Sequence, residues 1–86
     1  MRELFVTPQF EKDLSLIPIE LHKKADILIK QLLILPTDSS INILKLHGFN
    51  PPLWRVRIGA FRLIYSFDKK RLILHRFRHR KDVYKF

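Results

Sequence analysis

The sequence predicts an α+β domain in which two N-terminal helices pack on a sheet of about four strands, in the order β-α-α-β-β-β. Two changes of apolar spacing carry this prediction. Between residues 21 and 35 apolar residues recur every three or four positions, which is the spacing of a helix face. Between residues 54 and 67 they recur every second position, which is typical of strands with one buried face. We expect the 86 residues to form a single domain, because a chain of this length buries one modest core.

The N-terminal elements are a short strand and a short helix. Residues 2–6 (RELFV) are rich in strand-forming side chains and stop at a Thr-Pro break. Thr7 as N-cap, with Pro8 at the first helical position, predicts a helix that ends near Pro18. The core face of this helix is expected to carry Phe10, Leu14 and Ile17.

A second, longer helix is predicted from Pro18 to Pro36. Proline is favoured in the first turn of a helix, whereas in the interior it breaks the helix. Its apolar stripe is expected to cover one face of the sheet. The stripe consists of Leu21, Ala25, Leu28, Leu32 and Leu35.

Residues 53–65 (LWRVRIGAFRLIY) predict a β-hairpin. Gly59 at the first of two turn residues suits a type II′ turn, which places Ile58 opposite Phe61 and Arg57 opposite Arg62. A short strand is expected before it in residues 41–48. Another strand is expected after the hairpin in residues 71–77, but the sequence leaves open which of its alternate residues face the core. Alternation assigns Trp54, Val56, Ile58, Phe61, Leu63 and Tyr65 to the helix-covered face, and Arg55, Arg57 and Arg62 to the other.

The positive charge is concentrated in the second half of the chain. Residues 1–44 hold five Lys or Arg against six Asp or Glu, whereas residues 45–86 hold twelve against two. An evenly spread excess would serve solubility alone, but this segregation favours a surface that binds a polyanion, nucleic acid above all. The arginines of the hairpin fit that interpretation, because like charges directly opposed across strands are destabilising and arginine forks match phosphate oxygens. The alternative is that these long side chains simply extend from an exposed sheet face.

The C-terminal residues 75–86 (HRFRHRKDVYKF) continue the cationic surface and add groups that transfer protons. Neutral histidine can act as a base near neutral pH, and a tyrosine hydroxyl can act as an acid. Both residue types also pack or stack without any chemical role. The sequence has no cysteine, no paired histidine spacing and no glycine-rich phosphate loop, so it predicts neither a metal site nor a cofactor. It has no apolar run long enough for a signal peptide or a membrane span, and we expect a cytoplasmic protein without membrane contact.

Three motifs in order, KLHG (45–48), LWRVRIGAFRLIYSF (53–67) and HRKDVY (79–84), resemble the RelE/ParE superfamily of toxins from toxin–antitoxin modules. The resemblance extends over essentially the whole chain. It implies two helices on a strongly twisted antiparallel sheet with a basic concave face. In RelE-like members this face binds messenger RNA in the ribosomal decoding site. The ribose 2′-hydroxyl then attacks the adjacent phosphate without a metal and leaves a 2′,3′-cyclic phosphate.

The resemblance also assigns residues. Arg55 and Arg57 match the basic pair of the first hairpin strand, and Arg62 matches the arginine that opens the next strand. RelE-like sites often have lysine at the first two positions, and arginine is too basic to accept a proton, so the base stays open between Tyr84 and His79. The expected catalytic residues are Arg62, Tyr84, His79 and a C-terminal arginine that is Arg78 or Arg80. The expected phosphate-binding residues are Arg55, Arg57, Lys45, Arg76 and Lys81.

The implied partners are messenger RNA, the ribosome and a cognate antitoxin, whose acidic or amphipathic segment would cover the arginines. Operator DNA is expected only through the antitoxin. Two alternatives stay open at the level of sequence. A ParE-like protein would inhibit DNA gyrase with the same fold, and an inactive member would only bind its antitoxin.

Overall fold

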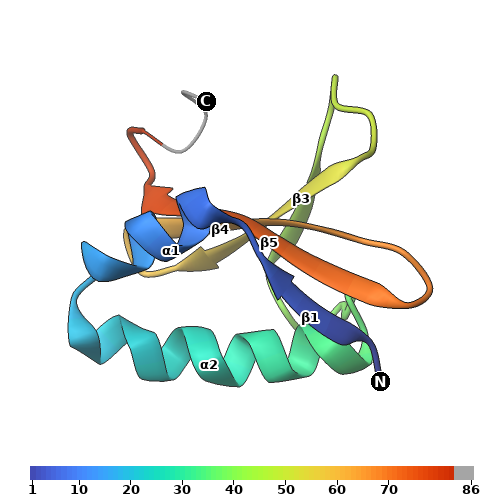
Figure 1. Ribbon diagram of the computed structural model, residues 1–86, viewed down its shortest axis with the longest axis horizontal. Helices are drawn as coiled ribbons and strands as arrows, with labels where there is room; N and C mark the ends of the chain where they lie inside the picture. Colours follow the sequence, from blue (N-terminus) through green and yellow to red (C-terminus); the bar gives the residue numbers. More distant parts are fainter. Residues whose placement is uncertain (83–86) are drawn as a thin grey trace.

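The described part of this computed structural model, residues 1–82, contains two helices and five strands. Figure 1 shows the longer helix running below the sheet and the shorter helix beside one end of it. The elements are β1 (Glu3–Val6), α1 (Pro8–Ser15), α2 (Ile19–Ile34), β2 (Ile43–Leu46), β3 (Leu53–Ile58), β4 (Phe61–Phe67) and β5 (Arg71–His79). The α+β class expected from the sequence is confirmed.

Both helices begin where the sequence predicts. The Thr7 side chain accepts a hydrogen bond from the backbone N–H three residues on, and Pro8 lies in the first turn of α1. α2 follows Pro18 and is longer, but in residues 1–82 no helix is both long and apolar enough to cross a membrane. Leu35, expected on the buried stripe, is instead extended and 49% exposed. The cause is Pro36, whose ring disfavours the helical conformation in the residue before it.

The sheet is mixed, with the strand order β1-β5-β4-β3-β2. Strands β2 to β5 are antiparallel neighbours, whereas β1 pairs with β5 in parallel, Glu3 opposite Arg71. The sheet thus has five strands where about four were expected, and β1 is parallel to its neighbour rather than antiparallel. This pairing joins the two ends of the chain, and local apolar spacing holds no information about so distant a partner.

The β3–β4 hairpin has the predicted register. Ile58 lies opposite Phe61, and Arg57 lies opposite Arg62. Gly59 has a φ of +60°, and no residue other than glycine in residues 1–82 has a positive φ. A positive φ at the first turn residue alone is the pattern of the type II′ turn.

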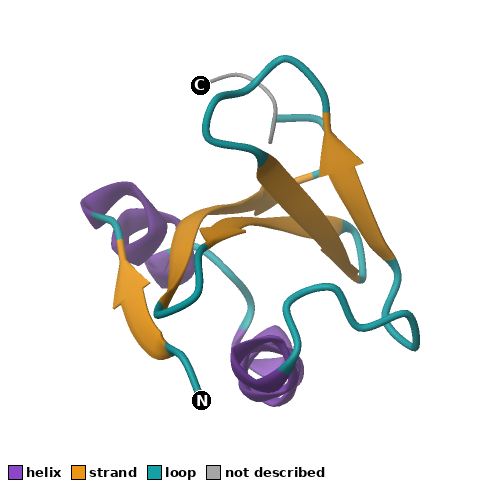
Figure 2. Cartoon of the chain, turned by 90° about the vertical axis from the view of Figure 1, so that its right-hand side faces the viewer, coloured by secondary structure: helices purple, strands orange, loops and turns teal. Residues whose placement is uncertain are grey.

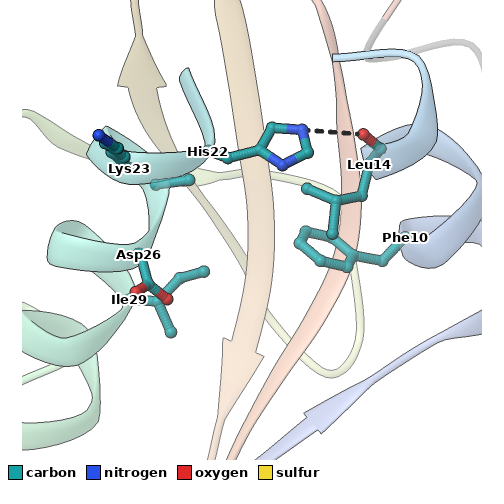
Figure 3. A pocket seen from close by; sticks show the side chains of 7 residues that line it. Phe10, Leu14, His22, Lys23, Asp26 and Ile29 are labelled. Carbon is teal, nitrogen blue, oxygen red and sulfur yellow. Dashed lines mark hydrogen bonds between the residues drawn. The ribbon is translucent and has the colours of Figure 1, made fainter. Parts of the chain in front are cut away.

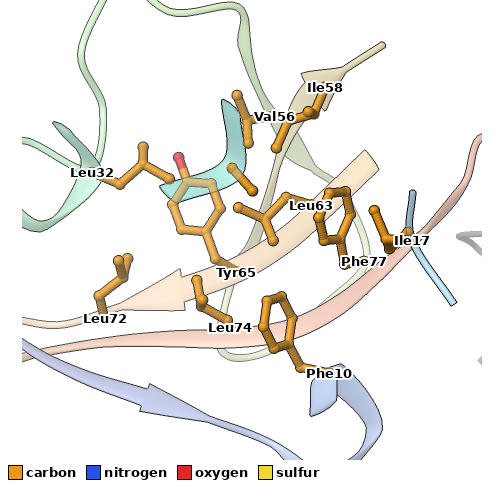
Figure 4. Packing of buried hydrophobic residues seen from close by; sticks show 11 residues of the cluster. Phe10, Ile17, Leu32, Val56, Ile58, Leu63, Tyr65, Leu72, Leu74 and Phe77 are labelled. Carbon is orange, nitrogen blue, oxygen red and sulfur yellow. The ribbon is translucent and has the colours of Figure 1, made fainter. Parts of the chain in front are cut away.

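The core fills the space between α2 and the sheet, with α1 closing one end (Figures 2 and 4). Figure 4 shows Leu32 of α2 beside the Tyr65 ring, and Phe10 of α1 near Phe77 and Leu74 of β5. The Phe10 and Phe77 rings are stacked with centroids 6.2 Å apart. The largest fully buried side chains of this core are Tyr65, Phe77, Leu32, Leu63, Leu72, Leu74 and Val56. Ile64 is also fully buried, but it belongs to a second cluster with Leu53.

A β-bulge in β5 changes which side chains face the core. Tyr65 pairs with Leu74 but its neighbour Ile64 pairs with Arg76, so His75 is an extra residue on β5. Without it, alternation from Leu74 would turn Arg76 inward. With it, Phe77 is fully buried and Arg76 shares a face with Ile64.

Replacing Tyr65 by phenylalanine is expected to lower the free energy of unfolding by about 1 to 2 kcal/mol at neutral pH. The buried Tyr65 hydroxyl donates to the Pro36 carbonyl at 2.6 Å, and phenylalanine leaves that oxygen without its donor. Burial also raises the pKa of Tyr65. The native state thus keeps a proton that the unfolded chain loses above about pH 10, so stability should fall as the pH rises past that value.

Urea unfolding of the parent and of Tyr65→Phe, at about pH 7 and about pH 11, measures both effects. The variant should lose less stability than the parent between the two pH values. Equal losses would show that Tyr65 does not retain its proton in the folded state.

Candidate nucleic-acid interface

Three arginines lie side by side on the three central strands of the sheet, near the turn between β3 and β4. Arg57 of β3 is directly opposite Arg62 of β4, and Arg62 is directly opposite Arg78 of β5. Their neighbours along each strand, such as Val56, Leu63 and Phe77, point into the core, so this row faces away from α2. We call this side of the sheet the arginine face. It carries Arg55, Arg57, Arg62, Arg76 and Arg78.

The bulge at His75 explains why Arg78 belongs to the row. Residues Leu72 and Leu74 are buried, so an unbroken strand would turn Arg78 toward the core as well. The extra residue reverses the alternation and brings Arg78 beside Arg62. Arg80 lies beyond the end of β5, where its N–H donates to the Ala60 carbonyl.

Arg55 differs from the other arginines because it is buried. It is only 9% exposed, and its cross-strand neighbour Ile64 is fully buried. Its Nε is buried and has no hydrogen-bond partner among residues 1–82. A guanidinium is costly to remove from water without a counterion, and no carboxylate of residues 1–82 forms a salt bridge with Arg55.

Arg62 is held by the turn that precedes it. Its Nη1 donates to the carbonyls of Gly59 at 3.0 Å and Phe61 at 2.9 Å. These bonds orient the guanidinium at the centre of the row and limit its conformations. Arg57, at one end of the row, is exposed to solvent.

Arg76 is neutralised by α1. Its Nε and Nη2 donate to the two carboxylate oxygens of Asp13 at 2.8 and 3.1 Å, and Asp13 also accepts from the Phe77 N–H. The bond to Asp13 raises the pKa of Arg76. Because β1 ends at Val6, Asp13 satisfies an N–H at the part of the β5 edge that has no strand partner. Arg76 therefore serves the packing of α1 rather than offering a free charge.

Other predicted site residues are not brought to the arginine face. Lys45 lies opposite Trp54 with its Nζ 5.7 Å from the Trp54 ring centroid, on the helix-covered face. His79 packs edge-on against the Phe61 ring, also on that face, because it lies next to Arg78 along the strand. Lys81 is exposed in the turn after β5 and donates its N–H to His79 Nδ1. Tyr84 lies outside the described residues.

His75 is brought to the arginine face, although the sequence did not single it out as a site residue. Its Nε2 lies 2.7 Å from the Ser66 hydroxyl, and burial lowers the pKa of its imidazole. A neutral, partly buried imidazole beside a cationic face is a candidate for proton transfer. The sequence indicated His75 only as one of the titratable groups in residues 75–86, because the bulge that turns it toward this face cannot be read from local spacing.

A separate hollow of about 310 Å³ lies between α1 and α2 (Figure 3). His22 lines this hollow, and its Nε2 donates to the carbonyls of Leu14 at 3.2 Å and Ile17 at 3.1 Å. This histidine therefore ties the two helices together and is remote from the arginine face. In residues 1–82 no three His, Cys, Asp or Glu side chains are grouped as metal ligands would be.

Replacing Arg57 by threonine is expected to raise the free energy of unfolding by about 0.5 kcal/mol at low salt. The change removes a charge directly opposite Arg62 and supplies a strand-forming residue. About 1 M salt should remove most of the charge contribution, because the Debye length falls to about 3 Å. Denaturant unfolding at both salt concentrations measures this. Arg71→Thr is the control, since Arg71 already pairs with Asp68 at 3.3 Å and its loss should not stabilise the fold.

Comparison with solved structures places the fold. No family model matches the chain, and no curated protein matches it as a relative. A chain of the RelB–RelE antitoxin–toxin complex from Methanococcus jannaschii superposes with a TM-score of 0.79 at 23% identity, covering 94% of this chain and 95% of that chain. A chain of the archaeal RelE–RelB complex from Pyrococcus horikoshii OT3 gives a TM-score of 0.77 at 23% identity, covering 92% of this chain and 94% of that chain.

The DinJ–YafQ complex of E. coli gives a TM-score of 0.76 at 19% identity, with 98% of this chain and 99% of that chain covered. The similarity thus spans both helices and all five described strands. The arginine face lies on a sheet of the same architecture as in these proteins. This chain has the fold of the RelE and YafQ toxins.

Proposed function

We propose that this protein is the toxin of a type II toxin–antitoxin module and that it cleaves messenger RNA on the ribosome. The observation that carries the proposal is the row of Arg57, Arg62 and Arg78 beside the buried Arg55, whose Nε has no hydrogen-bond partner in residues 1–82. Directly opposed like charges cost folding stability, so packing alone does not account for the row. A phosphate chain supplies the repeated anionic oxygens that arginine forks bind best.

The proposed reaction is a transfer within the RNA. The ribose 2′-hydroxyl attacks the adjacent phosphorus, the bond from phosphorus to the 5′ oxygen breaks, and a 2′,3′-cyclic phosphate remains. A base takes the 2′ proton, and an acid returns a proton to the leaving 5′ oxygen. Arg55, Arg57, Arg62 and Arg78 neutralise the charge that develops on the phosphate oxygens, which is usually the largest contribution to such a rate.

Tyr84 is the proton-transfer residue in this proposal, on the strength of the HRKDVY motif. Surrounding cations lower the pKa of a phenol and so favour its exchange of protons. His79 is not assigned to the reaction, because it packs on Phe61 at the opposite face from the row. Arg80 and Lys81 extend the positive surface beyond the end of β5.

A cognate antitoxin is the protein partner that we propose. The RelE and YafQ chains with the same fold are solved as antitoxin–toxin complexes. An acidic or amphipathic segment of such a partner would bind across the arginine face by charge complementarity. Operator DNA would then be reached only through the antitoxin.

Mapping transcript ends after induction of the protein in cells tests the function. We expect cuts at a fixed phase within codons, and with purified protein we expect cuts only when ribosomes are present. Arg62→Ala should abolish the cuts, and Tyr84→Phe should slow them by at least tenfold. Arg71→Ala is the matched control, since it removes an arginine of β5 that is already paired with Asp68.

Three results would contradict the proposal. Intact transcripts together with a DNA-damage response would indicate a gyrase inhibitor. Intact transcripts without any growth defect would indicate a protein that only binds its antitoxin. Equal cleavage by the parent, Arg62→Ala and Tyr84→Phe would show that the arginine face is not the site.

A further inference from the structure

A pocket of about 350 Å³ borders the arginine face. It is lined by Thr7 and Gln9 at the start of α1, Leu53 of β3, and His75 and Arg76 of β5. Its volume falls within the range of small-molecule sites. Leu53 is on the same face as Arg55, two residues along β3, and Arg76 is in register with Ile64, the partner of Arg55. Since neighbouring strands are about 4.8 Å apart, Arg55 lies roughly 10 Å from Arg76.

The cation of this pocket is already neutralised. Arg76 makes a two-pronged ion pair with Asp13, and both side chains are largely buried. The pocket therefore has no free positive charge to hold a phosphate, whereas the Nε of Arg55 has no hydrogen-bond partner in residues 1–82. A guanidinium with its edge fixed in this way still offers a flat face, on which nucleobases stack.

The other walls also suit a flat, uncharged ring. Burial lowers the pKa of His75, so its imidazole is neutral at physiological pH, and Ser66 holds one edge of the ring at 2.7 Å. Leu53 is 8% exposed and adds an apolar surface. Aromatic and apolar surfaces are the sites at which proteins stack unpaired bases.

Gln9 supplies the polar contact. The Thr7 hydroxyl has no proton left to donate, because it donates to the His75 carbonyl at 2.9 Å, and it already accepts from the Phe10 N–H at 3.1 Å. The Gln9 side chain is exposed and makes no hydrogen bond within residues 1–82. Its amide can donate and accept at once, as the edge of a base requires.

We propose that this pocket holds one unstacked nucleobase of the single-stranded RNA whose phosphates bind the arginine face. The inference rests on the proposed function and adds that different residues bind the backbone and the base of the RNA. The row and Arg55 bind the backbone, which every sequence shares, and the pocket binds a base, which differs between sequences. Gln9 is then a residue that influences which base is preferred.

The experiment measures the binding of short RNA at low salt, where phosphate contacts are strongest. Two tetranucleotides with 2′-O-methyl riboses, which cannot be cleaved by 2′-hydroxyl attack, carry either four bases or no bases on the same backbone. We expect the parent to bind the base-bearing chain about tenfold more tightly. Gln9→Trp fills the mouth of the pocket and should remove most of this difference without weakening the abasic chain. Gln9→Ala should change the ranking among chains of the four bases.

Gln31→Trp on α2 is the control, because it places the same side chain on an exposed position of another element. The inference is overturned if the parent binds both chains equally, or if Gln9→Trp keeps the full difference. It is also overturned if Gln9→Trp weakens only the complex with an antitoxin, since the pocket then belongs to a protein partner. A different result would show that the proposed function has failed. In that case the parent protein would bind the two tetranucleotides no more tightly than the Arg55→Met variant does.

Discussion

A variant with methionine in place of Arg55 is expected to be more stable than the parent and at least a hundredfold slower in cleaving RNA. The Nε of this arginine is buried without a partner in residues 1–82, and the cross-strand Ile64 is fully buried. An apolar side chain of similar length suits such a site better, so we expect a gain of about 1 to 2 kcal/mol in the free energy of unfolding. In the proposed reaction the rate falls because a preorganised cation at the phosphate is lost.

Urea unfolding and the ribosome-dependent cleavage assay measure the two effects on the same preparation. Arg55→Lys is the matched control, since it keeps the charge but not the fork, and it should gain no stability. A methionine variant that is less stable than the parent would show that Arg55 is satisfied within the fold. One that is fully active would show that no phosphate binds there.

Replacing Asp13 by alanine is expected to lower the free energy of unfolding by about 3 kcal/mol. Asp13 accepts two hydrogen bonds from Arg76 and a third from the Phe77 N–H, and its side chain is 9% exposed. Alanine leaves a largely buried guanidinium and a backbone donor without partners. The same variant should lose the slow hydrogen exchange of the Phe77 amide, because α1 no longer holds this part of the β5 edge.

Two comparisons make this result specific. The double variant Asp13→Ala with Arg76→Met should recover most of the lost stability, because no unpaired charge remains. Asp68→Asn breaks an exposed ion pair with Arg71, and we expect it to cost less than about 1 kcal/mol. A loss below about 1 kcal/mol for Asp13→Ala would mean that Arg76 finds solvent when its partner is removed.

The hairpin could be predicted in detail because its determinants are local. Alternating residues on both strands and a glycine at the turn leave one register, which puts Trp54, Val56, Ile58, Phe61, Leu63 and Tyr65 on one face. Arg57 opposite Arg62 followed directly from that register. The cap at Thr7 was equally local, since its hydroxyl bonds to a backbone group three residues away.

Which basic residues lie on the arginine face with a charge to offer depends on contacts between segments that are distant in sequence. Lys45 and His79 are cationic or titratable residues close in sequence to the arginines, yet strand pairing puts both on the helix-covered face. Arg76 is on the arginine face, but α1 neutralises it through Asp13. No pattern of residue types distinguishes a free arginine from one whose partner lies on another element.

By itself the sequence determined the helices, the hairpin and its register, and the accumulation of positive charge in its second half, because each follows from spacing over a few residues. Only the tertiary structure decided that β1 pairs with β5 in parallel and that Arg55 is buried. It also decided, through the single extra residue His75, that Arg78 completes the row. The physical reason is the two-residue period of a strand: one inserted residue exchanges its two faces, and the packing of the whole sheet selects where that insertion lies.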